Sequence, residues 1–231
     1  MRSMTQMRSM TAYLLQLLVW LVFMAIVILW PAGTLAFPGG WAFIVLFAFG
    51  SLAMIFWLAR HSPSLLRERM GSPLQPDQKP WDRVWLMLFI PAFCIWMGFM
   101  GWDAARTGFM AIPPWLQTLG GVSMVIYMLG AWWTFRENAF AAPSVKIQPG
   151  QKVIDTGSYA TVRHPMYASA LLLFLGTPLL LGSWWGLLLS PLFILAIAWR
   201  AVHEERTLGR ELSGYEEYAG RVRYRLVPFI W

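Results

Sequence analysis

Two short groups of residues carry side chains suited to chemistry in an otherwise apolar chain. The first, Arg163-His164-Pro165-Met166-Tyr167, closes a polar segment and opens a long apolar one. Proline at the start of an apolar run marks the first turn of a helix, whose free amides and positive dipole end attract an anion. A carboxylate, such as that of an amino-acid-like cofactor, would suit this position. The alternative interpretation is that Arg163 anchors the chain at lipid headgroups.

The second group is the acidic pair Glu204-Glu205. A carboxylate here is suited to pairing with the ammonium group of a ligand. The alternative is a surface ion pair with Arg200, one helical turn earlier, which would contribute only a few tenths of a kcal/mol.

Composition indicates that these groups lie in an integral membrane protein. Of 231 residues, 58% are hydrophobic and only 13% are charged, whereas a soluble domain carries about 25% charged residues. Fifteen Trp and fifteen Phe suit the aromatic belts of membrane interfaces. The net charge of +7 lies in short clusters beside apolar runs, which favours membrane orientation and anionic lipid over nucleic acid as its explanation.

Four membrane-spanning helices are predicted within residues 12–135. A signal peptide is the alternative for the first, but its apolar run is longer than a signal core and more spans follow. The short loop with Asp103 and Arg106 is expected to be solvated. The expected spans cover residues 12–30, 41–59, 84–102 and 115–135.

The last apolar run, residues 166–199, is too long for one straight span. Its 34 residues would extend ~51 Å as a helix, against a hydrocarbon core of ~30 Å. Gly182-Ser183 lies near its middle, so the run is predicted to fold as a helical hairpin. The hairpin places every Lys and Arg except Arg106 on one side of the membrane, the cytoplasmic side by the positive-inside rule. It also brings His164 and Glu204 to the same side.

Several other kinds of site are excluded or not supported. Cys94 is the only cysteine, so neither an intrachain disulfide nor a cysteine metal cluster is possible. The three histidines lack zinc-ligand spacing, and no metal site is expected. The signatures of the common soluble enzyme classes are missing.

The combination of motifs resembles a family of membrane enzymes. Gly157-x-Tyr159, then Arg163-His164-Pro165-x-Tyr167, an apolar hairpin and the Glu204-Glu205 pair are similar to the isoprenylcysteine carboxyl methyltransferase family and the related phospholipid methyltransferases. Later residues, Tyr215-x-x-Tyr218 and Arg225-Leu-Val-Pro228, continue the resemblance, which covers about residues 138–228 and looks most like the bacterial branch. Such enzymes transfer a methyl group from S-adenosylmethionine (SAM), leaving S-adenosylhomocysteine.

The resemblance implies roles for particular residues. Arg200 and Glu205 are the candidate catalytic residues, and Arg200 and Arg225 are the candidates for binding the acceptor. The candidate cofactor-binding residues are Lys152, Val153, Ile154, Tyr159, His164, Pro165, Met166, Tyr167 and Glu204.

The prediction is therefore an all-α, multi-pass protein of the cell (inner) membrane with about five embedded segments, the last a hairpin. One membrane domain covers residues 1–231, and residues 136–231, comprising a cytoplasmic loop, the hairpin and a tail, form the catalytic region. Both ends of the chain and the SAM site are expected in the cytoplasm. The acceptor is expected to be a lipophilic carboxylate, amine or thiol, and membrane lipid the main partner. An NADPH-dependent reductase of the sterol-reductase-like type and a non-catalytic membrane protein are the alternatives.

Overall fold

A computed structural model describes residues 2–75, 77–107 and 111–231, with the side chains of residues 2–9 and 107 left aside. Throughout these residues the regular structure is helical and contains no strand. Within the described ranges, five helices are long and apolar enough to cross a membrane: α1 (Arg2–Ala32), α2 (Pro38–His61), α4 (Pro80–Trp102), α5 (Pro114–Glu137) and α7 (Trp184–Glu211). A sixth apolar helix, α6 (Pro165–Leu181), is shorter. The predicted all-α, multi-pass membrane fold is confirmed.

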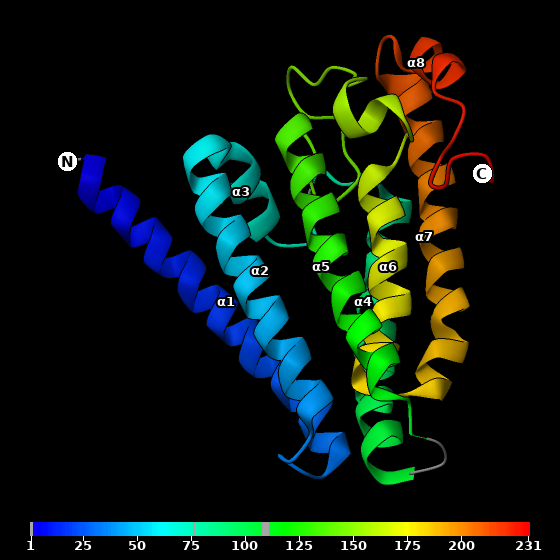
Figure 1. Ribbon diagram of the computed structural model, residues 1–231. Helices are drawn as coiled ribbons and strands as arrows, with labels where there is room; N and C mark the ends of the chain where they lie inside the picture. Colours follow the sequence, from blue (N-terminus) through cyan, green and yellow to red (C-terminus); the bar gives the residue numbers. More distant parts are fainter. Residues whose placement is uncertain (1, 76, 108–110) are drawn as a thin grey trace.

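The predicted hairpin is formed by α6 and α7. Gly182 ends α6 with φ 87°, a left-handed conformation that glycine adopts without steric cost. Ser183 then caps α7, and its Oγ accepts a hydrogen bond from the Gly186 amide at 2.8 Å. The chain therefore reverses direction between the two helices, and α6 and α7 lie against each other (Figure 1).

The expectation that Asp103 is solvated was wrong. A π-helical turn, η1 (Asp103–Thr107), continues α4 to the hairpin turn, where Asp103 is buried and accepts a hydrogen bond from Ser183 Oγ at 2.6 Å. Arg106, in the same turn, is exposed and donates to the carbonyl of Ala32. In this turn Asp103 is therefore buried and bonded to the hairpin, whereas Arg106 is exposed.

Close backbone approach joins α5 to α6. A side chain at Gly120 of α5 would collide with the backbone of Gly176 and Leu180 in α6, so only glycine permits this contact. Small residues have this role in membrane helix pairs, where tight packing replaces the hydrophobic effect as the driving force. The opposite side of α6 contacts aromatic rings of α4 and α7, including Phe89 and Phe193. The short α6 is therefore the centre of the bundle.

The polar segments gather at one end of the bundle. Figure 1 shows the first part of α1, the short helix α3 (Pro63–Met70), the loop after α5 and the helix α8 (Tyr215–Arg221) at this same end. A 3₁₀ turn, η2 (Gly157–Ala160), interrupts that loop. A helix needs about 20 residues to cross the hydrocarbon core, so the 28-residue α7 extends beyond it and carries Glu204 and Glu205 to the polar end.

Candidate functional site

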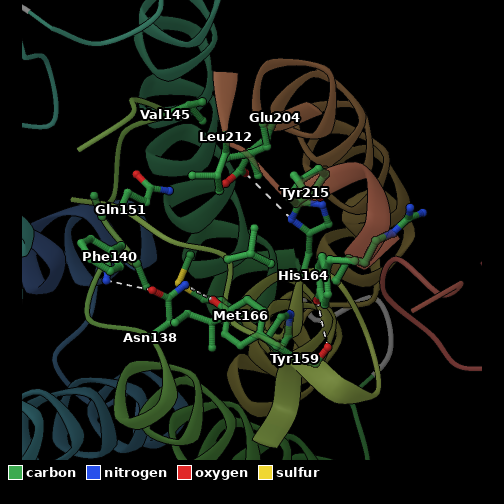
Figure 2. Close-up of a pocket in the computed structure, with 18 of the residues that line it drawn as sticks. Asn138, Phe140, Val145, Gln151, Tyr159, His164, Met166, Glu204, Leu212 and Tyr215 are labelled. Carbon is green, nitrogen blue, oxygen red and sulfur yellow. Dashed lines mark hydrogen bonds and ion pairs between the residues drawn. The ribbon is translucent and has the colours of Figure 1, made fainter. Parts of the chain in front are cut away.

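A cavity opens at the polar end of the bundle, where the loop after α5 crosses the first turn of α6 and the last turns of α7 (Figure 2). Its volume is about 100 Å³. The loop provides one wall, α6 provides the floor at His164–Tyr167, and α7 and α8 provide Glu204 and Tyr215. The lining residues are Asn138, Phe140, Ala141, Ala142, Ser144, Val145, Lys146, Gln151, Lys152, Val153, Ile154, Tyr159, Arg163, His164, Pro165, Met166, Tyr167, Glu204, Leu208, Leu212, Tyr215 and Tyr218.

The start of α6 is fixed by backbone bonds from a distant segment. Pro165 occupies the first helical position, and the amides of Arg163 and His164 donate to the carbonyls of Tyr224 and Arg225 at 2.9 and 3.0 Å. The next amides belong to the first turn of the helix and have no carbonyl one turn earlier to bond. The floor of the cavity is therefore a helix start that offers amides and a positive dipole end to an anion.

The two neighbouring glutamates have different environments. Glu205 is paired with Arg163 at 3.0 Å, Arg225 at 2.9 Å and His164 at 3.2 Å, and it does not line the cavity. Glu204 lines the cavity and accepts a 2.7 Å hydrogen bond from the Tyr167 hydroxyl, with His164 Nδ1 at 4.0 Å. Within the described parts of the chain, no Lys or Arg lies within ion-pair distance of Glu204. Its carboxylate is therefore the one of the pair that is open to an external cation. Figure 2 shows Glu204 beside His164 at the cavity.

Tyrosine and serine hydroxyls add neutral polar groups to the cavity. Burial raises the pKa of Tyr159, whose hydroxyl accepts a 2.9 Å bond from the Asn138 side chain, so the phenol is neutral at physiological pH. Burial likewise raises the pKa of Tyr215. The hydroxyls of Tyr215 and Ser144 are buried beside the cavity and have no hydrogen-bond partner in the described structure. Buried polar atoms are normally bonded, so these two are available to a ligand.

A buried ion pair holds the wall of the cavity in place. Arg200 Nε bonds Asp82 Oδ1 at 2.8 Å, and both side chains are almost fully enclosed. The other oxygen of Asp82 accepts the Val145 amide at 2.8 Å, while the guanidinium of Arg200 donates to the Pro143 carbonyl at 2.7 Å. Residues 143–145 are therefore joined to α4 and α7 through this pair.

A second set of charges anchors the same wall. Lys146 Nζ lies 3.0 Å from Glu68 of α3 and 3.1 Å from Asp77. Burial alone would lower the pKa of Lys146, but the hydrogen bonds that its ammonium donates to Glu68 and Asp77 outweigh burial and raise it. The segment between α2 and α4 thus supports the wall through Lys146 and does not itself line the cavity.

All nine residues predicted to bind the cofactor line this cavity, from Lys152 in the loop to Glu204 in α7. The other three predicted site residues, Arg200, Glu205 and Arg225, do not line it and are occupied by protein partners. Sequence reasoning missed Asp82, which lies near the start of α4 and whose partners are distant in the chain. The one signal in the sequence was an acidic residue two positions before an apolar run that begins at Val84.

Comparison with protein families relates part of the chain to a known family. Residues 115–213 match the phospholipid methyltransferase family, PEMT, over a segment that runs from α5 through the loop and hairpin to the turn before α8. A search of the curated proteins found no match. The family resemblance predicted from the motifs is confirmed at this level, and the family contains membrane methyltransferases similar to isoprenylcysteine carboxyl methyltransferase.

Proposed function

We propose that this chain is a SAM-dependent methyltransferase that binds its cofactor in the cavity around Glu204 and methylates a lipophilic acceptor at the cytoplasmic side of the membrane. The observation that carries the proposal is the approach of Glu204 to the start of α6. Its carboxylate is 2.7 Å from the Tyr167 hydroxyl and 4.0 Å from the His164 ring. An acceptor for an ammonium and donors for a carboxylate therefore lie side by side.

This pairing suits the amino-acid end of SAM, whose ammonium and carboxylate are attached to the same carbon atom. Glu204 would pair with the ammonium, and the first amides of α6 would hold the carboxylate. The unpartnered hydroxyls of Ser144 and Tyr215 would bond polar groups of the nucleoside, and the ring of Tyr159 would contact its base. The donor set of the cavity therefore fits the cofactor.

When bound, SAM supplies an electrophilic methyl group on a sulfonium centre. The residues of this chain would orient the cofactor and exclude water, because methyl transfer depends mainly on the in-line approach of two held groups. Glu205 pairs with Arg163, His164 and Arg225 in one cluster, which includes part of the floor. We assign that cluster the role of fixing the His164 ring and the start of α6.

Binding would also require the wall to move. Ligand cavities for drug-sized molecules are typically about 300–1,000 Å³, which is larger than the space between the wall and α6. The outer part of the wall contains Gly150, with φ 71°, and the exposed side chain of Lys152. Amide hydrogen exchange of residues 147–156 should slow when S-adenosylhomocysteine binds, whereas exchange at the α5–α6 contact should not change.

Calorimetry with S-adenosylhomocysteine on the purified protein, in detergent and in lipid nanodiscs, tests the proposal. Glu204→Gln should weaken binding at least about tenfold, because it leaves an ammonium without its counter-charge. Glu217→Gln removes an exposed carboxylate of α8 and is the matched control, with unchanged affinity. Absence of binding to the unaltered protein, together with thermal stabilisation by NADPH, would replace the proposal with the reductase alternative.

Activity requires a separate measurement. Incubation with methyl-labelled SAM and total membrane lipid, followed by mass spectrometry of the labelled product, would identify the acceptor. We expect one lipophilic product with the wild-type protein and none with Glu204→Gln.

A further inference from the structure

A second cavity lies among apolar helices of the bundle. It is formed by α1, α2, α3, α5 and the first turn of α6 and has a volume of about 320 Å³. We call it the lateral groove. Its lining residues are Leu17, Trp20, Phe47, Gly50, Ser51, Met54, Ile55, Leu58, Leu66, Arg69, Met70, Tyr127, Met128, Ala131, Phe135 and Met166.

Arg69 is the one charged residue among those lining the lateral groove. Its Nη1 donates to the carbonyl of Ala141 at 2.8 Å and lies 3.8 Å from the sulfur of Met166, and its guanidinium covers the ring of Phe135 at 4.1 Å. No carboxylate of the described residues lies within ion-pair distance of it. Burial lowers the pKa of Arg69 to about 10, which leaves the side chain cationic at neutral pH.

Arg69 is half-buried among apolar groups, and a cation in such a place without a counter-charge is unfavourable, because charges withdrawn from water are normally paired. Neutral contacts satisfy part of the guanidinium of Arg69 but supply no negative charge. The missing partner is therefore an anion, and carboxylates and phosphates match the geometry of a guanidinium.

The position of Arg69 matches the shape of an amphiphile. The rest of the groove extends from α3 along the apolar faces of α1, α2 and α5 as far as Phe47 and Trp20. Gln16 of α1 donates to the carbonyl of Met70 at 3.0 Å, which joins α1 to the end of α3 beside the groove. An apolar tail would lie between the spanning helices, with its charged head at Arg69 on the polar side.

The lateral groove also adjoins the cofactor cavity. Met166 lines both spaces, and Ala141, whose carbonyl binds Arg69, lines the cofactor cavity. A head group at Arg69 would therefore be separated from the cofactor cavity by the Met166 side chain, an unbranched and adaptable group.

We propose that the lateral groove binds the methyl acceptor, and that Arg69 selects an amphiphile bearing an anionic carboxylate or phosphate. That the bound molecule is the methyl acceptor rests on the proposed methyltransferase function. That the groove binds an anionic amphiphile rests on the groove alone.

Native mass spectrometry of the full chain, released from detergent, tests this selection with three probes that share one tail. The probes are oleate, 1-oleoyl lysophosphatidic acid and uncharged monoolein, offered together in equal amounts. The amount of at least one anionic probe retained by the wild-type protein should be about tenfold greater than that of monoolein. Preferential retention of oleate would indicate recognition of a carboxylate, and that of lysophosphatidic acid recognition of a phosphate. Equal retention of all three probes would overturn the proposal.

Four variants locate the selection. Arg69→Met should abolish the preference for an anion, and Arg69→Lys should keep part of it. Arg67→Met removes an exposed charge from the same short helix and should change nothing. Ser51→Phe fills the groove without altering Arg69 and should reduce retention of all three probes. A preference for anions that survives in Arg69→Met would refute the role of this arginine.

S-adenosylhomocysteine calorimetry on the same samples separates the two proposals. Arg69→Met should keep its affinity within about twofold, because Arg69 does not line the cofactor cavity. A wild-type protein that retains anionic probes but binds no S-adenosylhomocysteine would contradict the methyltransferase and leave the groove as a lipid site. A variant that loses S-adenosylhomocysteine but keeps the anion preference would show that Arg69 only supports the wall.

Discussion

The ion pair between Asp82 and Arg200 should determine whether the cavity around Glu204 forms at all. Asp82 is fully buried, and its two oxygens accept bonds from Arg200, Gln78 and Val145. Asp82→Asn removes the charge and one of the two acceptor oxygens, and Arg200→Met removes the partner at similar length. Either change leaves an uncompensated charge in an enclosed site.

The expected cost follows from this enclosure. Removing one partner of a buried ion pair destabilises a protein by about 3–5 kcal/mol, mainly because the remaining charge is unpaired. The double variant carries neither charge, so its cost should fall short of the sum of the single costs by about 2 kcal/mol or more. The exposed pair between Lys79 and Glu211 provides the control, since Lys79→Met should cost at most about 1 kcal/mol.

Unfolding by titration with SDS from dodecylmaltoside measures these costs, and calorimetry with S-adenosylhomocysteine reports the state of the wall at residues 143–145. Both single variants should bind the ligand weakly, and the double variant should recover part of the affinity. Strict additivity of the two changes, or a cost below about 1 kcal/mol for Arg200→Met, would refute the assignment of Arg200 to positioning. If the double variant recovers affinity for S-adenosylhomocysteine but its KM for the acceptor does not recover, Arg200 would instead have the role in acceptor binding that the sequence predicts.

Three further changes test other parts of the structure. Gly120→Val should prevent the close contact with Gly176, lower the free energy of unfolding by about 1–3 kcal/mol or more, and so lower the thermal midpoint in detergent. The same change at the exposed Gly220 should have little effect. The hydrogen bond between Lys146 and Asp77 lowers the pKa of Asp77 and helps to raise that of Lys146. This bond should therefore stabilise the fold from about pH 4 to about pH 10.5. Outside that range, the stability of the wild type relative to Lys146→Met should diminish. Glu205→Gln should lower thermal stability and weaken S-adenosylhomocysteine binding less than Glu204→Gln does, and equal losses of affinity would contradict the difference inferred between the two glutamates.

Sequence patterns predicted the features that depend on local chemistry. The length of the last apolar run and the distribution of Lys and Arg require a reversal near Gly182, where the structure has one. Proline in the first turn predicts the start of α6, and helical spacing carries Glu204 to the same end. The four predicted spans each lie within a helix of the structure, although α1 begins at Arg2 and α4 at Pro80, before the predicted positions.

The features that sequence did not predict depend on distant partners. Asp82 and Arg200 are separated by 118 positions, and nothing in the neighbours of either residue indicates the other. Asp103 was interpreted as solvated because acidic loop residues usually are, but the π-helical turn brings it to Ser183. The family resemblance gave Glu204 and Glu205 different roles, but their residue type could not, because adjacent residues of one type differ only in the faces of α7 on which they lie.

The backbone bonds from Arg163 and His164 to Tyr224 and Arg225 have a consequence for biosynthesis. The spanning helices can enter the bilayer as each is synthesised, whereas the start of α6 lacks these carbonyl acceptors until translation has passed residue 225. Insertion into the membrane would therefore precede completion of the floor of the cavity. A chain interrupted between residues 211 and 224 should be inserted normally and still be unable to bind S-adenosylhomocysteine.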